Sequence, residues 1–191
     1  MTAALNPSDG PKLGPSGLHL PETRLSRAID AVIVWIGETS SWIWTILVLL
    51  IVYQVVQRYV FGLGSIKMEE MQWHLYAVGF MLAIPFAEIA ERHVRIDVVA
   101  EHWPYRRRLW IEAIGLTFFL LPFSIFVAWW AVPYMLHSWQ VNEISSAPDG
   151  LGYRYVLKAF IVVTFVLLAA AGLSRLSRVI AALRAPGRRS V

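Results

Sequence analysis

The ionisable residues that could do chemistry gather in two short segments of this chain. Glu69 and Glu70 open an apolar stretch of bilayer length, and a segment of mixed charge follows it: Glu91, Arg92, His93, Arg95 and Asp97. Adjacent carboxylates could bind a cation or a proton, and charges of alternating sign favour ion pairs within the segment or with a partner. The acidic pair also suits the positive end of a helix dipole. Neither segment by itself therefore indicates a reaction.

Catalytic motifs are absent from the sequence. It contains no Gly-Lys-Ser/Thr phosphate loop, no Gly-x-Ser-x-Gly turn and no His-Glu-x-x-His helix. The absence of cysteine excludes disulfides, thiolate metal sites and thiol catalysis. We therefore expect no enzymatic activity, no catalytic residue, no metal site and no cofactor.

Haem is the one cofactor that the histidines leave open. Small four-helix membrane cytochromes hold haem between histidines on neighbouring helices. His74 and His137 lie near the outer ends of two predicted helices. Both also stand close to Trp and Gln residues, in surroundings typical of a membrane interface. A small membrane cytochrome therefore stays as the alternative function, which a Soret band in the purified protein would identify.

The composition requires lipid as the solvent for part of the chain. Hydrophobic residues make up 57% and charged residues 16% of the 191 residues, whereas ordinary soluble domains carry about 25% charged residues. A soluble core of this size could not hide so much apolar surface. The net charge of +4 does not indicate nucleic acid, because the basic residues flank apolar stretches, as in membrane proteins.

Four stretches can cross a bilayer, which takes about 20 mostly apolar residues. They are residues 39–59, 68–90, 109–136 and 155–176. The central part of each contains no Asp, Glu, Lys, Arg or His. Proton pumps and ion pathways tend to place such residues there, so we expect no conducting pore. The predicted fold class is an all-α integral membrane protein with four transmembrane helices.

Lys and Arg are distributed unequally between the two sides of these stretches. Of the 17 Lys and Arg residues, thirteen lie before the first stretch, between the second and third, or from the last residues of the fourth onward. The positive-inside rule therefore predicts that both termini and the second connection lie in the cytoplasm. Residues 1–24 are predicted as a disordered tail, residues 25–183 as the membrane domain, and residues 184–191 as a basic tail.

A separate amphipathic helix is one interpretation of the segment before the first stretch. Apolar residues recur there at helical spacing: Leu25, Ile29, Val32, Ile33 and Ile36. Such a helix would lie in the membrane interface. A longer, tilted first helix explains the same pattern, so both interpretations stay open.

Several short motifs follow one another in a distinctive order. They are Arg58-Tyr59-Val60-Phe61, a short turn, Glu69-Glu70, an apolar span, and Arg92-His93-Val94-Arg95-Ile96-Asp97. In order, spacing and topology the chain resembles the DctQ-like family, the small membrane subunits of tripartite ATP-independent periplasmic (TRAP) transporters, over about residues 25–183. It departs from many members by having Arg92 instead of Gly before the histidine, and Lys67-Met68 where a Trp is common.

The resemblance implies a scaffold subunit of a sodium-coupled transporter of the bacterial inner membrane that takes up an organic acid or related solute. Its expected partners are membrane lipid, a large DctM-like membrane subunit that carries the substrate and sodium sites, and a periplasmic DctP-like solute-binding protein. The residues expected to order the two rims and contact the large subunit are Arg58, Glu69, Glu70, Arg92, His93, Arg95 and Asp97. The candidates for docking the binding protein lie in an outer loop: Asn142, Glu143, Asp149 and Arg154. A free-standing channel or assembly factor, which needs neither partner, is a third interpretation.

Overall fold

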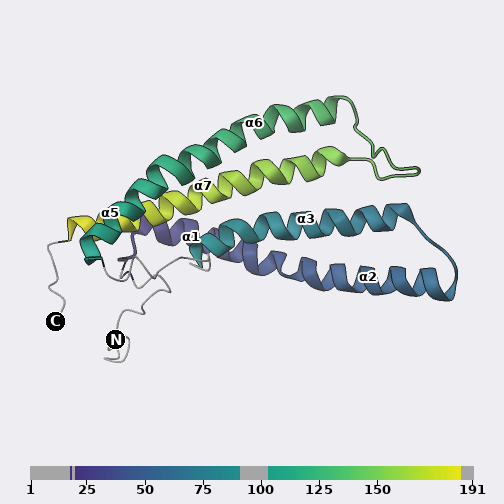
Figure 1. Cartoon of the computed structure of the whole chain (residues 1–191), viewed down its shortest axis with the longest axis horizontal. Helices are drawn as coiled ribbons and strands as arrows, with labels where there is room; N and C mark the ends of the chain where they lie inside the picture. Colours follow the sequence, from purple (N-terminus) through teal and green to yellow (C-terminus); the bar gives the residue numbers. More distant parts are fainter. Residues whose placement is uncertain (1–17, 19, 91–102, 186–191) are drawn as a thin grey trace, which may run out of the picture.

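The protein is built from long helices that run in alternating directions. The computed structural model describes residues 18, 20–90 and 103–185, and every regular element among them is helical. Figure 1 shows two hairpins, formed by α2 (Trp42–Val60) with α3 (Ile66–Ile89) and by α6 (Leu121–Gln140) with α7 (Arg154–Arg184). The hairpins lie together at one end, beside α1 (Arg24–Ser40) and α5 (Tyr105–Gly115), and diverge toward the other. We call the end with α1 and α5 the base, and the end with loops 61–65 and 141–153 the loop end.

α7 is the central helix of this arrangement. It contacts α1, α3, α5 and α6, whereas α2 packs chiefly on α3. Gly172 is buried where α7 meets the start of α6: a methyl group there would meet the side chain of Leu120 and lie 3.3 Å from a methyl carbon of Leu121. Small residues at a helix contact let two backbones approach closely, which is how membrane helices commonly pack.

A break at Ser41 separates α1 from α2. The hydroxyls of Ser40 and Ser41 both donate to the carbonyl of Gly37, at 2.9 and 3.0 Å, and such bonds compete with the helical ladder and bend helices. Ser41 nevertheless keeps right-handed helical angles, φ −60° and ψ −26°, and α1 and α2 together form the continuous helical segment Arg24–Val60, so both interpretations of this segment stay open. α1 packs on α3 and α7, and Ile33 is its fully buried apolar residue at 1% exposure.

α5 and α6 are joined by one π-helical turn, η1 (Leu116–Leu120). Pro122 follows directly in the first turn of α6. Proline lacks an N–H and its ring clashes with the carbonyl four residues earlier. A π turn at that point relieves the clash, because it widens the helix and shifts the bonding pattern by one residue.

Three helical segments are long and apolar enough to cross a membrane: Arg24–Val60, Tyr105–Gln140 and Arg154–Arg184. They contain three of the four predicted stretches. The remaining stretch, 68–90, coincides with α3, which has 24 residues and is therefore about 36 Å long. α3 falls short in apolar character because it carries polar residues such as Gln72, His74 and Glu88.

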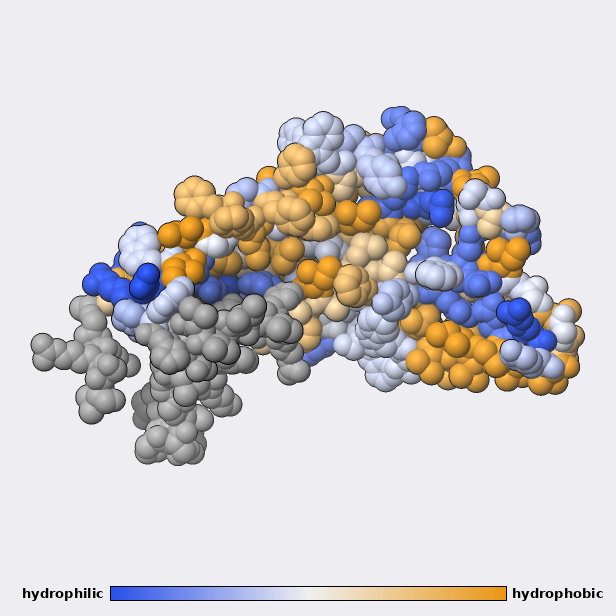
Figure 2. Space-filling model, viewed as in Figure 1, coloured by the Kyte–Doolittle hydropathy of each residue, from blue (hydrophilic) through white to orange (hydrophobic). Residues whose placement is uncertain are grey.

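The outer surface of the helices is largely apolar. Figure 2 shows hydrophobic surface along α2 and along the α6 side, with hydrophilic surface toward the two ends. On α6, for example, Phe126 and Trp129 are 62% and 74% exposed, and on α2 Leu49 is 64% exposed. Such a surface is what lipid or a membrane partner covers.

A small apolar core lies at the base. Leu18 is 4% exposed and packs with Leu109, Leu116 and Val179, which are 1%, 5% and 0% exposed. The sequence predicts that Leu18 lies in a disordered tail, whereas in the structure this residue packs against the helices. Most of that tail, residues 1–17 and 19, lies outside the described residues, as do residues 186–191 of the basic tail.

Candidate functional site: polar clusters at the two ends of the helices

Glu70 fastens the loop between α6 and α7 to the start of α3. Its carboxylate accepts a hydrogen bond from the Ser145 hydroxyl and another, 2.6 Å long, from the backbone N–H of Leu151. The N–H of Ser145 in turn donates to the carbonyl of Leu151 at 3.0 Å. Hydrogen bonds to an ionised acceptor are stronger than neutral ones. Glu70 therefore joins α3 to a loop whose contact residues are 75 and 81 positions away in sequence.

Two further features shape this connection. Lys67 forms an ion pair with Asp149 at 2.7 Å, but the two side chains are 52% and 80% exposed, so the pair contributes little to stability. Next to Asp149, a methyl group at Gly150 would come within 2.9 Å of the Ser145 hydroxyl oxygen. A side chain at position 150 would thus push away the hydroxyl that reaches Glu70.

Glu143 is the second carboxylate that orders the loop. It contacts the ammonium group of Lys158, and the guanidinium of Arg154 lies 3.9 Å away. Lys158 is 11% exposed and sits over the ring of Tyr134, 3.9 Å from its centroid. The hydrogen bond from Lys158 is the main reason that the pKa of Glu143 lies below its usual range.

The loop backbone adopts conformations that side chains rarely accept. Asn142, Asp149 and Tyr153 have φ angles of 46°, 57° and 63°. Asn and Asp tolerate this left-handed region, whereas a bulky aromatic residue is strained there. Such strain persists only where surrounding contacts determine the conformation, and it is common at binding surfaces. The loop also presents Ile144 and Tyr153 at 65% and 70% exposure.

The residues predicted for this end behave differently from one another. Glu70 is engaged, whereas its neighbour Glu69 and also Arg58 are exposed and form no ion pair with any described residue. Three of the docking candidates, Glu143, Asp149 and Arg154, are in ion pairs that order the loop. The fourth, Asn142, is exposed in a turn. Sequence reasoning missed Ser145, for which a serine in a polar loop carries no signal.

Arg175 forms the centre of the polar cluster at the base. Its guanidinium Nε contacts the carboxylate of Glu112 on α5, and it lies 3.9 Å from a carboxylate oxygen of Glu88 on α3. The three side chains are only 6%, 19% and 10% exposed. One side chain of α7 thereby holds α3, which belongs to the other hairpin, and α5, which leads into α6.

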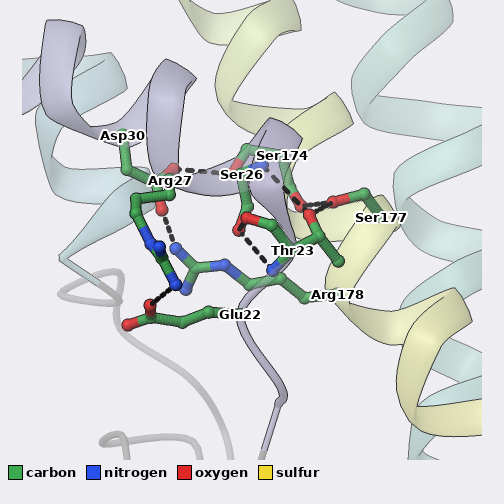
Figure 3. A network of polar contacts seen from close by, with 8 residues as sticks. All are labelled: Glu22, Thr23, Ser26, Arg27, Asp30, Ser174, Ser177 and Arg178. Carbon is green, nitrogen blue, oxygen red and sulfur yellow. Dashed lines mark hydrogen bonds and ion pairs between the residues drawn. The ribbon is translucent and has the colours of Figure 1, made fainter. Parts of the chain in front are cut away.

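A second set of contacts joins α1 to α7 (Figure 3). The carboxylate of Asp30 forms an ion pair with Arg178 and accepts a 2.6 Å hydrogen bond from the hydroxyl of Ser174. Thr23, which caps the first turn of α1, also shares a 2.8 Å hydrogen bond with the hydroxyl of Ser177. α1 is thus held to α7 by polar contacts along about two turns of α1.

These contacts line a small hollow between α1, α3 and α7. Its ionisable residues are Asp30, Glu88, Arg175 and Arg178. Two acids and two bases compensate one another, so the hollow offers no excess charge that would bind a substrate. The arrangement is suited to holding helices together.

The structure does not describe the inner residues that the sequence singled out. Arg92, His93, Arg95 and Asp97 lie outside the described residues, so their assignment stays a prediction. The described base cluster instead uses five residues that were not among the predicted site residues: Asp30, Glu88, Glu112, Arg175 and Arg178. In the sequence, acidic residues and arginines stand at the same ends of the apolar stretches, and this pattern could have indicated ion pairs between them.

The two histidines give the cytochrome alternative no support. A ring nitrogen of His74 bonds the carbonyl of Glu70 at 2.7 Å, and His137 is exposed in the last turn of α6. Among residues 18, 20–90 and 103–185, no group of three or more His, Cys, Asp or Glu could hold a metal ion.

Comparison with known proteins identifies the family. A family model described as "Tripartite ATP-independent periplasmic transporters, DctQ component" matches residues 47–182, which is well over half of the chain. No curated protein and no solved structure matches. The match spans α2 to α7 and includes both polar clusters except for α1. The chain therefore belongs to the DctQ family, the small membrane subunits of TRAP transporters.

Proposed function

We propose that this protein is the scaffold subunit of a sodium-coupled TRAP transporter in the bacterial inner membrane. In this role it supports a large membrane subunit, which carries the substrate and sodium sites, and helps a periplasmic solute-binding protein to dock. The transported solute is an organic acid or a related small molecule. The chain itself binds no substrate.

The observation that carries this proposal is the position of the polar residues. They lie at the two ends of the described helices and connect helices to one another. Between these ends, the segment from α5 through η1 to α6 carries no charged residue from 113 to 136, and α7 carries none from 159 to 174. A subunit that moved ions or substrate would need polar groups along its length. A subunit that only supports a partner needs a fixed shape, which the two clusters supply.

We also propose that α3 crosses the membrane as a fourth span, with both termini in the cytoplasm. α3 runs antiparallel beside α2 and has the length to cross. Its polar residues lie mostly near its two ends, where water and headgroups begin. The excess of Lys and Arg at the base supports a cytoplasmic location for that end.

The loop 141–153 is the surface that we assign to the solute-binding protein. Its contacts to Glu70 and Lys158 give it a defined shape before any partner arrives. A preordered loop loses little conformational freedom on binding. Its exposed Ile144 and Tyr153 supply the apolar contact area that interfaces use.

A matched pair of variants tests the scaffold role. Glu70→Ala removes the acceptor that holds the loop, whereas Glu38→Ala removes an exposed carboxylate of α1. Each variant is produced together with the large subunit and the binding protein, and solute uptake and co-purification of the large subunit are measured. We expect Glu70→Ala to lower uptake several-fold and Glu38→Ala to leave it near the unchanged level. Full uptake by the Glu70→Ala complex would contradict the proposed role of the loop, and purification without any large subunit would contradict the scaffold role.

The absence of cysteine makes a test of the membrane topology simple. Single cysteines at Gly64 and Ser146 would report on the loop end, and one at Ala185 on the base. A membrane-impermeant maleimide should label the first two in intact spheroplasts and the third only after permeabilisation. Labelling of Ala185→Cys in intact spheroplasts would contradict the orientation. Protection of Gly64→Cys there would contradict the fourth span.

A further inference from the structure

One face of α5 and η1 points away from the bundle and changes character along its length. Arg107, Trp110, Ile114 and Phe118 follow one another at three- and four-residue spacing, so they share a helix face. The opposite face carries Leu109 and Leu116, which are 1% and 5% exposed in the core of the base. The four residues of the first face therefore point outward.

Along this outward face the side chains change from cationic to an indole and then to apolar ones. Arg106 and Arg107 are exposed at its start, and Trp110 is 57% exposed one turn later. Ile114 and Phe118 follow at 49% and 70% exposure. From Arg107 to Phe118 the helix rises about 16 Å, close to half of a hydrocarbon core about 30 Å thick. The order matches the layers of one bilayer leaflet: phosphate, interface and acyl chains.

The two arginines are available to an anion. Neither Arg106 nor Arg107 forms an ion pair with a carboxylate among the described residues. The guanidinium of Arg107 lies over the ring of Trp103, 4.9 Å from its centroid. This contact restricts the guanidinium while leaving it charged, because a cation–π contact does not neutralise the cation.

We propose that this face binds an anionic phospholipid, with the headgroup phosphate on Arg106 and Arg107, the headgroup boundary at Trp110, and an acyl chain along Ile114 and Phe118. Clusters of basic residues at the end of a membrane helix attract anionic lipids. A soluble anion would match the arginines but not the apolar surface that continues from them. The inference rests only on the membrane placement of the segment Tyr105–Gln140 and does not depend on the transporter role.

The test measures lipid binding to the full-length subunit in detergent. Native mass spectrometry compares retention of phosphatidylglycerol with that of phosphatidylcholine across a lipid titration. Two Arg contacts should favour the anionic lipid on the order of 30-fold, and Arg106→Gln/Arg107→Gln should remove most of that preference. The control, Arg24→Gln/Arg184→Gln, removes the same charge from exposed positions at the base and should keep the preference.

Three outcomes would overturn the proposal. They are equal retention of the two lipids by the unchanged protein, an equal loss in the control variant, and full competition by inorganic phosphate. The last would identify a simple anion site. Trp110→Ala adds a second test: if the headgroup boundary lies at the indole, this variant should weaken retention of both lipids, and unchanged retention would contradict that placement. Thermal unfolding of each variant without added lipid verifies that folding is intact. None of these outcomes bears on co-purification with the large subunit, so the two proposals fail separately.

Discussion

Replacing Arg175 with methionine should destabilise the base more than the loss of an exposed charge on the same helix. The Arg175 side chain is 6% exposed and meets carboxylates from α3 and α5, at side-chain exposures of 10% for Glu88 and 19% for Glu112. Methionine retains much of the length and apolar stem of arginine. The variant therefore removes the cation and leaves the surrounding packing largely intact.

The expected magnitude follows from the burial of the three groups. Removing one partner of a buried ion pair costs about 3–5 kcal/mol, because the remaining charge stays out of water. Two carboxylates would remain at this site. For a chain of this size, that loss corresponds to a fall in the unfolding midpoint on the order of 10 °C.

Thermal unfolding of the purified subunit in mild detergent measures this effect. Arg184→Met is the matched control, because Arg184 lies on the same helix and is exposed. A triple variant with Glu88→Leu, Glu112→Leu and Arg175→Met should recover part of the loss, since it also removes the two acids that Arg175 contacts, and replacing buried ion pairs by apolar residues is often neutral or stabilising. If Arg175→Met and Arg184→Met unfolded at the same temperature, the cluster would not hold the base together. If the triple variant were worse than the single one, buried charge would not be the cause.

Two further predictions concern the helix contacts and the loop. In Gly37→Ala the new methyl group would lie 2.6 Å from the ring carbon Cγ of Phe86. Overpacking should lower the free energy of unfolding by about 1–3 kcal/mol, whereas the gain in helix propensity is at most about 1 kcal/mol. As the control, Gly64→Ala places its methyl group in open space and should unfold at the same temperature as the unchanged protein. Equal unfolding midpoints for the two variants would contradict the close α1–α3 contact. For the loop, the pKa of Glu143 is lowered chiefly by its hydrogen bond from Lys158. The stabilisation that the ionised Glu143 gives the fold is therefore present above the ordinary carboxyl pKa and is lost as the pH falls through the lowered pKa. The protection factors of the backbone amides in residues 141–153, which correct for the intrinsic slowing of exchange in acid, should therefore fall below about pH 4.5, and a Glu143→Gln variant that kept the same fall in protection would refute this assignment.

The helical elements follow closely from the sequence. Predicted stretches 39–59 and 68–90 end within a few residues of α2 and α3, because apolar composition and length report directly on which segments prefer lipid. The third and fourth stretches lie inside longer helical segments, residues 105–140 and 154–184. These segments extend past the apolar residues into charged residues at their ends. The π turn before Pro122 could not be predicted in detail, since proline only requires that the local bonding change.

The sequence predicts that polar clusters lie at the ends of the helices, but it does not predict which residues form them. Glu70 was selected with Glu69 because adjacent acids at a helix start are equivalent in sequence, and the fold alone turns Glu70 toward the loop. Likewise, Arg175 counted only as a basic residue for topology, although it is the centre of the base cluster.

The sequence by itself determined that this is an all-helical membrane protein of the DctQ family with its charges near helix ends, because solvent preference is a property of each segment. The tertiary structure alone decided which charges meet. Glu112 and Arg175 are 63 residues apart, and Asp30 and Ser174 are 144 apart. Such pairs form only when α1 and α5 pack against α7. Burial then makes their choice of partner energetically important, since a charge removed from water must find its partner nearby.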